Sequence, residues 1–186
     1  MSLLKEVIES SKEIDNTTKI ALENRFNEQV VKRNEIFLKE GQYCNDLLFV
    51  EKGLLRAYYL KEGKEVTDWF GTEGTFMTSI HSFYNGFPSE QYIHGIEDTI
   101  IRKISKKKIA EISKEHPSIE KWFRLITTQH LTRLQQRITA LQFYTAKERF
   151  ALLKEKNPVV LQKAPVSHIA SYLGISLETL SRVRAR

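Results

Sequence analysis

The sequence has a single cysteine and no long apolar segment. Cys44 alone cannot form a disulfide framework or a cysteine-ligated cluster within a chain of 186 residues. No apolar run approaches the roughly 20 residues that a membrane-spanning helix needs, and the N-terminus lacks the apolar core of a signal peptide. These absences predict a soluble, cytoplasmic protein with no membrane partner.

Groups that could support catalysis or bind a metal are also sparse. The five histidines have no close metal-ligand spacing, and His81, His94 and His116 lack the strand register of a metal site on a cupin-like barrel. His81 or His94 could serve as an axial haem ligand and Cys44 as a redox switch, but isolated residues of these types usually belong to the core or the surface. We therefore expect no enzyme activity, no metal and no cofactor.

The clearest pattern lies at the C-terminal end of the chain. Two short amphipathic segments meet at Gly174, with Ile169 and Leu173 before the glycine and Leu180 and Val183 after it. Two short helices joined at a glycine are typical of a helix-turn-helix, whose second helix lies in the major groove of DNA. The pattern therefore predicts a reader of double-stranded DNA.

The second helix of this motif is expected to begin at Ser176, whose hydroxyl can cap the first turn. Glu178 and Arg182 are four residues apart and share a face. An exposed ion pair on an ordinary surface helix would explain them. So would base recognition, because a carboxylate can accept from cytosine and a guanidinium can donate to guanine. The two interpretations are compatible, since an ion pair can hold the arginine in place.

Charge divides the chain into two unequal parts. Residues 1–99 carry 11 Lys and Arg against 17 Asp and Glu, whereas residues 100–186 carry 18 against 6. A basic excess concentrated beside a helix-turn-helix is the pattern expected of a phosphate-binding surface. The alternative is a basic surface that is merely solvated, but that would not require such an asymmetry. The charge distribution therefore favours nucleic acid as a partner.

The acidic part has the pattern of a small β-structure. Helical spacing runs from residue 2 to about residue 25, and six segments with strand character follow, separated by glycine-containing turns. These segments are residues 35–38, 46–50, 54–60, 65–70, 91–94 and 99–104. Short strands at this spacing indicate an antiparallel sandwich or barrel.

Helices are predicted for the rest of the chain. A short one begins at Ser105, a long one covers residues 118–143, another covers 145–156, and Pro165 opens the helix-turn-helix. The long helix carries an apolar stripe with 3-4-3 spacing, formed by Leu131, Leu134, Ile138 and Leu141. This stripe could pack on the chain's own barrel, but that role is expected of Ile119, Trp122, Phe123 and Ile126 further upstream. Because helix-turn-helix proteins usually bind palindromes as two-fold dimers, the stripe predicts a homodimer interface.

This order of elements resembles the Crp/Fnr transcription regulators. The resemblance is carried by Phe37-Leu-Lys-Glu-Gly41, by Phe49-Val-Glu-Lys-Gly53, by the long helix and by Gly174-Ile-Ser-Leu-Glu-Thr-Leu-Ser-Arg182. It implies an α+β fold: an N-terminal double-stranded β-helix (a jelly roll of the cyclic-nucleotide-binding type) over residues 1–117, a long dimerisation helix over 118–143 and a helix-turn-helix DNA-binding domain over 144–186.

The resemblance also assigns DNA contacts. Glu178, Ser181 and Arg182 fall where Fnr-like members contact bases, which implies a half-site related to TTGA. Leu177 stands where Crp-like members carry an arginine, which argues against a Crp-type operator. The residues expected near phosphates are Ser167, His168, Ser176, Thr179, Arg184 and Arg186. The family usually continues into a small wing, so we expect either a wingless DNA-binding domain with salt-sensitive affinity or a truncated chain.

The effector pocket is where the sequence departs from the cyclic-AMP-binding members. Thr78-Ser79 occupy the position of the family's Gly-Glu pair, and Ser89-Glu90 occupy that of its phosphate-binding Arg-Ser pair. The charge-assisted contact to a phosphate is lost, so cyclic AMP is not expected to bind. The candidate pocket residues are Phe76, Met77, Thr78, Ser79, Ser89, Glu90, Gln91, Thr132 and Arg133. Arg133 could supply a positive charge for an anionic effector, or it could be an ordinary surface arginine.

We therefore expect a homodimeric Crp/Fnr-type regulator that binds a palindromic operator, with RNA polymerase and an unidentified small molecule as further partners. The alternative is a ligand-sensing adaptor that has a degenerate cyclic-nucleotide-binding domain and no specific DNA binding. An enriched palindrome among selected DNA duplexes would distinguish the two.

Overall fold

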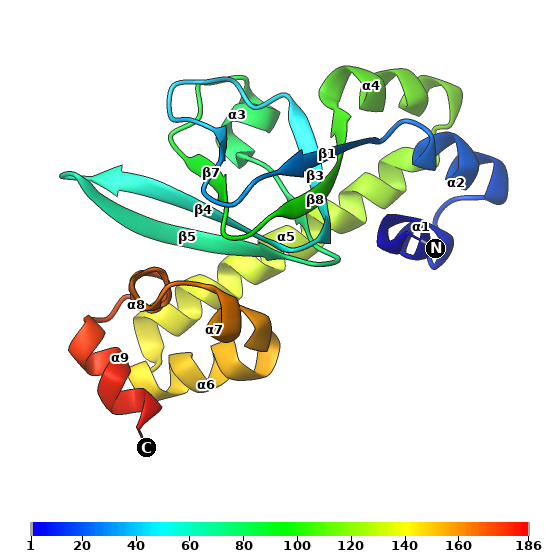
Figure 1. The fold of residues 1–186 in the computed structure, drawn as a ribbon. Helices are drawn as coiled ribbons and strands as arrows, with labels where there is room; N and C mark the ends of the chain where they lie inside the picture. The colour runs from blue at the N-terminus through cyan, green and yellow to red at the C-terminus, as the bar shows by residue number, and fades with distance from the viewer. Residues whose placement is uncertain (1, 186) are drawn as a thin grey trace.

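The computed structural model describes residues 2–185. A β-roll lies above the long helix α5, and a group of short C-terminal helices packs beneath the roll on the side of its longest hairpin (Figure 1). The two N-terminal helices lie at the opposite end of α5 from the C-terminal group. This is the mixed helix and antiparallel-sheet fold that the sequence predicts.

The helical spacing of residues 2 to about 25 corresponds to two helices. They are α1 (Leu3–Glu9) and α2 (Asn16–Glu23). The break occurs because the side chain of Asp15 accepts a hydrogen bond from the backbone N–H of Thr18 at 2.8 Å and so caps a new helix.

The roll consists of two four-stranded antiparallel sheets, ordered β1-β8-β3-β6 and β2-β7-β4-β5. The strands are β1 (Asn27–Val31), β2 (Ile36–Leu38), β3 (Asp46–Lys52), β4 (Leu54–Lys61), β5 (Lys64–Thr72), β6 (Phe76–Met77), β7 (Tyr92–Gly95) and β8 (Thr99–Ser105). The six predicted segments are all strands. The sequence analysis missed β1, which begins with three polar residues, and β6, which has only two residues.

The β4–β5 hairpin is the longest in the roll and extends beside the C-terminal helices (Figure 1). Glu62 and Gly63 connect its strands with φ values of 52° and 75°, as a two-residue type I′ turn requires. β4 is buried without interruption from Leu54 to Tyr58. An antiparallel strand buried on both faces needs a cover on its outer side, and the C-terminal helices supply it.

Three further helices connect or follow the strands of the roll. α3 (Ile80–Asn85), which was not predicted, lies within residues 74–91, the segment that aligns with the ligand-binding cassette of the cyclic-AMP-binding members. α4 (Lys106–Glu115) follows β8. α5 (Ile119–Phe143) is the predicted long helix. Its first turns carry the apolar residues expected to pack on the roll, and that prediction is confirmed. They are Ile119 and Trp122, which are buried, and Phe123 and Ile126, which pack against the same core.

The C-terminal group contains α6 (Ala146–Lys156), α7 (Pro158–Lys163), α8 (Val166–Leu173) and α9 (Leu177–Arg184). Asn157-Pro158 ends α6 as predicted, but Pro158 also starts α7, because proline fits the first position of a helix. Leu54 and Phe70 of the roll share one apolar core with residues of these helices, including Val160, Leu173 and Leu180. No helix within residues 2–185 is long and apolar enough to span a membrane.

Candidate functional site

The helix-turn-helix forms where the sequence predicts it. α8 ends at Gly174, whose φ of +64° is in the left-handed region, and a Cβ there would lie 3.3 Å from Leu141 of α5. The hydroxyl of Ser176 then accepts from the backbone N–H of Thr179 at 3.2 Å and caps α9. Leu180 is fully buried and fixes α9 against the C-terminal core. The predicted turn and cap are confirmed.

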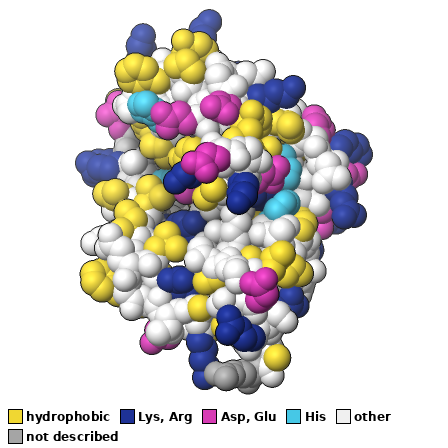
Figure 2. Space-filling view, turned by 90° about the vertical axis from the view of Figure 1, so that its left-hand side faces the viewer, with side chains coloured by type: hydrophobic (Ala, Val, Ile, Leu, Met, Phe, Trp, Pro, Cys, Tyr) yellow, Lys and Arg dark blue, Asp and Glu magenta, His cyan; other side chains and the backbone are white. Residues whose placement is uncertain are grey.

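The outer face of α9 is open to solvent. Its exposed residues include Leu177, Glu178, Ser181, Arg182 and Arg184, together with the cap Ser176. Figure 2 shows Lys and Arg side chains at the lower end of the molecule, where α9 lies. Arg186, which the sequence analysis placed near phosphate, lies outside the described residues. The structure therefore brings the predicted base-contacting residues together on one accessible face.

The ion pair expected between Glu178 and Arg182 does not form within residues 2–185. Glu178 instead accepts from the Ser176 hydroxyl at 2.9 Å, and Arg182 donates to the Thr179 hydroxyl at 3.2 Å. Local hydroxyls thus satisfy the two charged groups separately. Neither charge is neutralised by the other, so both remain available to a partner.

Of the two α8 residues predicted near phosphate, Ser167 is exposed but His168 is not. The His168 side chain faces the roll, where the guanidinium of Arg56 donates to its Nε2 at 3.1 Å. Its side chain is only 19% exposed. The phosphate contact predicted for His168 is therefore not available in this arrangement, because the β4–β5 hairpin covers the side chain.

A second set of polar contacts ties α8 to the same hairpin. The Ser171 hydroxyl accepts from the backbone N–H of Thr67 at 2.8 Å and donates to the backbone carbonyl of Glu65 at 3.2 Å. Arg137 of α5 donates to the carbonyls of Thr67 and Tyr172 at 3.1 and 3.0 Å. The helix-turn-helix is thus joined to the roll by hydrogen bonds as well as by an apolar core.

Arg56 is the centre of these contacts and is completely buried. Its Nε donates to the Thr67 hydroxyl at 2.9 Å, its Nη1 pairs with Glu65, and it lies over the Tyr58 ring. Because arginine has no acceptor, the nitrogen of His168 that it contacts must be unprotonated. Burial and the Arg56 charge lower the pKa of His168 to about 4.

His94 of β7 belongs to the same cluster. Its ring centroid lies 5.8 Å from that of His168. Burial, followed by the charges of Arg56 and His168, lowers its pKa to about 4. The sequence analysis missed Arg56 and Glu65 altogether. The signal that could have identified Arg56 was a charged residue within the apolar run Leu54–Tyr58.

Several of the predicted effector residues line one cavity of about 350 Å³ between the roll, α3 and α5. Thr78, Ser79, Glu90 and Gln91 are among them, and Asp68 of β5 joins them. None of the described residues that line it is Lys or Arg. The cavity therefore presents carboxylates and hydroxyls, which suit a phosphate poorly.

Hydrogen bonds within the protein already occupy most of these polar groups. Ser89 is buried and donates to the Ser79 hydroxyl at 2.9 Å, and Gln91 donates to the Asp68 carboxylate at 2.6 Å. Thr78 donates to the carbonyl of Asp46 at 3.0 Å. A ligand would have to compete with these bonds.

The remaining predicted pocket residues do not line this cavity. Met77 is buried in the core of the roll, and Phe76 packs on Phe49 and Trp122. Thr132 is exposed and donates back to the carbonyl of Thr128 at 3.0 Å. Arg133 lines two other cavities: one of about 40 Å³, which it shares with Phe76, Met77 and Thr78, and one of about 310 Å³ next to the C-terminal helices.

The apolar stripe of α5 lies largely in solvent. Leu131 is 65% exposed, Ile138 is 55% exposed and Leu141 is 41% exposed, while Leu134 is half-buried. Exposed apolar side chains that form a contiguous stripe often mark a surface that another molecule covers.

Metal-binding groups do not converge in the described part of the chain. Within residues 2–185 no three His, Cys, Asp or Glu side chains are grouped so that they could hold a metal ion. Cys44 is buried, with its Sγ 3.4 Å from the Thr78 hydroxyl.

Comparison with known proteins identifies both parts of this architecture. Residues 28–116, which run from β1 through α4, match the family model of the cyclic nucleotide-binding domain. Over 170 residues the chain is 24% identical to the transcriptional activator protein FnrA of Stutzerimonas stutzeri, covering 84% of this chain and 68% of that protein. Over most of its length the chain is similar to regulators of the Crp/Fnr type. The family resemblance and the fold class predicted from the sequence are confirmed.

Solved structures of Crp/Fnr-type proteins share this fold. FixK2 from Bradyrhizobium japonicum superposes with a TM-score of 0.74 at 19% identity, over 86% of this chain and 83% of that one. A regulator from Eubacterium rectale assigned to the crp/fnr family superposes with a TM-score of 0.69 at 21% identity, over 92% and 82% of the two chains. These relatives are described as transcription regulators, which supports a regulatory role for this chain.

Proposed function

We propose that the chain is a cytoplasmic transcription regulator that binds a palindromic DNA operator as a homodimer. One observation carries the proposal: α9 presents Glu178, Ser181 and Arg182 on an exposed face, at the end of a helix-turn-helix whose turn and cap are fully formed. In this fold the second helix enters the major groove, where carboxylate and guanidinium groups distinguish base edges.

Within this proposal the residues of α8 and α9 have separate roles. Glu178, Ser181 and Arg182 contact bases in a half-site related to TTGA, with Leu177 beside them. Ser167, Ser176, Thr179 and Arg184 lie near phosphates and set the register of the helix in the groove. His168 reaches phosphate only if α8 leaves the hairpin, since Arg56 now contacts its ring.

The dimer forms through the exposed stripe of α5, which includes Leu131, Ile138 and Leu141. A two-fold pair of these stripes places two copies of α9 on successive half-sites of a palindrome. RNA polymerase is a further partner of the bound regulator. A small-molecule effector acts through the effector domain, α5 or their junction with α8.

This regulator does not depend on cyclic AMP. The cavity that corresponds to the family pocket contains Asp68 and Glu90, and its described lining has no cationic side chain to pair with a cyclic phosphate. Calorimetric titration of the protein with cyclic AMP is expected to give no saturable heat. Saturable binding that disappears in Ser79→Leu would contradict this part of the proposal.

Selection of bound DNA from random duplexes tests the proposal as a whole. The expected result is enrichment of an inverted repeat with TTGA-like half-sites one helical turn apart. The same selection with Arg33→Ala, which removes an exposed arginine of the roll, should give the same motif. No enriched palindrome would contradict the proposal and favour a ligand-sensing adaptor.

A further inference from the structure

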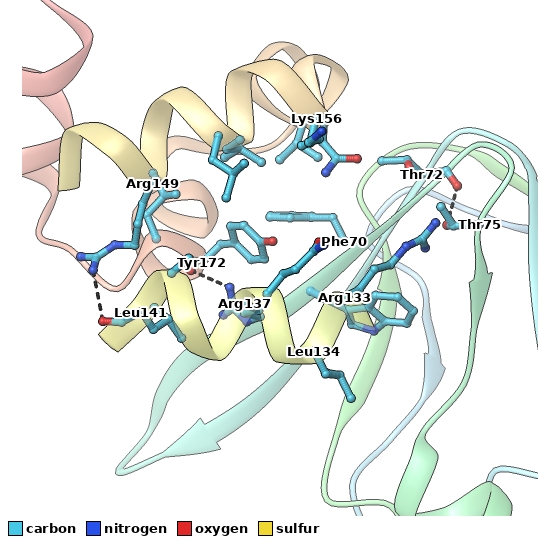
Figure 3. A pocket seen from close by; sticks show the side chains of 18 of the residues that line it. Phe70, Thr72, Thr75, Arg133, Leu134, Arg137, Leu141, Arg149, Lys156 and Tyr172 are labelled. Atoms are coloured by element: carbon cyan, nitrogen blue, oxygen red, sulfur yellow. Dashed lines mark hydrogen bonds between the residues drawn. The ribbon is translucent and has the colours of Figure 1, made fainter. Parts of the chain in front are cut away.

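Four cationic side chains, three of them arginines without an ion-pair partner among residues 2–185, line a cavity of about 310 Å³ at the junction of the roll and the C-terminal helices. β5 contributes Trp69 and Phe70, α5 contributes Arg133 and Arg137, and α6 contributes Arg149 and Lys156 (Figure 3). Its volume is at the lower end of the range of small-molecule pockets, which starts at about 300 Å³.

Charge distinguishes this cavity from the one at the cassette. Four lining residues are Lys or Arg, and none of the described lining residues is Asp or Glu. The cassette cavity has the opposite composition, with Asp68 and Glu90 and no described Lys or Arg. Trp69 and His130 line both cavities and stack edge to face at 4.6 Å, so they form the wall between them.

The three arginines keep their positive charge unneutralised. Arg137 donates only to the backbone carbonyls of Thr67 and Tyr172, and Arg149 donates only to those of Leu141 and Tyr144. The Nε of Arg149 is buried and has no acceptor within residues 2–185. Arg133 has no carboxylate within ion-pair distance in the same part of the chain.

The rest of the lining is apolar and aromatic. Phe70 and Tyr172 pack with ring centroids 5.4 Å apart, and the guanidinium of Arg137 lies 4.1 Å from the centre of the Tyr172 ring (Figure 3). A flat, apolar ligand body would contact these rings, and an oxyanion on it would meet the guanidinium groups at the rim.

We propose that this junction cavity binds a small organic anion with an aromatic body and one phosphate or carboxylate group. Arg133 binds the anion, Arg137 and Lys156 add positive potential, and the aromatic residues hold the ring. The site is distinct from the cassette pocket, and its ligand binding is independent of whether the chain binds DNA.

Arg133 points away from the most exposed residue of the α5 stripe. It is two residues from Leu131, which places the two about 160° apart around the helix. Leu134 and Leu141 of the stripe line the cavity, so the proposed dimer would border it.

Calorimetric titration with model ligands tests the proposal on the full chain. The probes are 1-naphthyl phosphate and 1-naphthoate, which share the aromatic body but differ in the anion, and neutral 1-naphthol and inorganic phosphate, which each lack one half. At least one of the two anionic probes should bind saturably, and the stronger identifies the anion. We expect 1-naphthol and inorganic phosphate to bind about tenfold more weakly, because each loses one set of contacts.

Variants show whether binding occurs at this cavity. Arg133→Gln should weaken the anionic probe by about tenfold, the effect of one charge-assisted hydrogen bond. Arg133 has an exposed side chain, so this variant should fold, and circular dichroism verifies it. The matched control Arg124→Gln removes another exposed arginine of α5 and should leave binding unchanged. Equal binding of 1-naphthol and the anions, no binding of either anion, or equal loss in both variants would overturn the proposal.

Discussion

Arg56 of β4 and His168 of α8 are 112 residues apart in the chain, yet the guanidinium of Arg56 donates a hydrogen bond to the His168 ring at 3.1 Å. This contact links the roll to the first helix of the helix-turn-helix. Glu65 of β5 pairs with Arg56 and lies 3.7 Å from His168, so one cluster of charges fixes α8 on the hairpin. The orientation of α9 therefore depends on residues of the effector domain.

Removal of the two partners of this ion pair should affect stability unequally. Glu65→Gln leaves the fully buried Arg56 without its carboxylate, whereas Arg56→Met leaves Glu65, whose side chain is 44% exposed and can be solvated. We expect Glu65→Gln to lower the free energy of unfolding by about 1 to 3 kcal/mol and Arg56→Met to lower it by less. Urea unfolding of both variants measures the difference.

Glu40→Gln is a suitable control for this comparison, because Glu40 is an exposed carboxylate of the same domain with no ion-pair partner within residues 2–185. Its stability should match the parent protein. If Arg56→Met proves the more damaging of the two substitutions, packing of the arginine stem rather than its charge dominates at this site.

The two buried histidines predict a defined pH dependence of stability. Both have a pKa of about 4 in the folded protein, below the value of 6.5 expected when the chain is unfolded. Above pH 6.5 they are neutral in both states and contribute no pH dependence. Between pH 6.5 and 4 the unfolded chain binds their protons and the folded chain does not. The free energy of unfolding therefore decreases as the pH is lowered through this range. We expect a fall on the order of 1 to 3 kcal/mol per histidine.

Thermal unfolding between pH 7.5 and 4.5 measures this fall. The double variant His94→Gln and His168→Gln removes both titrating groups and should flatten the profile over the upper part of the range. Glu65, whose pKa Arg56 holds below its usual value against the opposing effect of burial, contributes only at lower pH. A double variant with the parent profile would show that other groups produce the dependence.

The exposed stripe on α5 predicts which substitutions would dissociate the proposed dimer. Leu131→Glu combined with Ile138→Glu places two carboxylates on side chains that are 65% and 55% exposed in the single chain. Like charges would then face each other across the two-fold axis, so light scattering should report half the parent mass with unchanged helix content.

Gln136→Glu adds a carboxylate to an exposed position about 140° around the same helix from Leu131 and should leave the proposed dimer intact. A dimer that survives the double substitution would place the interface elsewhere on the molecule.

The helix-turn-helix could be predicted in detail because its signals are local. A glycine in the left-handed region and a capping serine three residues before Thr179 are both visible in the sequence, and they determine where α8 ends and where α9 begins. The same is true of the capping box at Thr145 and Glu148 that starts α6. These caps involve residues within one turn of a helix, so the ends of the helices can be predicted without knowledge of the tertiary structure.

Long-range relationships could not be predicted. Arg56 and His168 belong to segments that each have an ordinary local pattern, and only the fold brings them together. His168 was consequently assigned to DNA phosphate when it contacts the roll. Arg133 was assigned to one pocket with residues 76–79 and 89–91, but these residues line separate cavities. Arg133 lines a small cavity with Phe76, Met77 and Thr78 and also lines the junction cavity, because helical periodicity does not show which element faces each side of α5.

The central claim is that α9 reads bases, and Arg182 provides its most direct test. Selection from random duplexes, followed by binding measurements on the selected operator and its point variants, should compare the parent protein with Arg182→Ala. The account predicts a loss of about 1 to 3 kcal/mol on the operator and relaxed preference at one base pair of each half-site, with the other positions unchanged. An equal loss of affinity on every sequence, with the preference intact, would contradict base recognition by Arg182 and reduce its role to a phosphate contact.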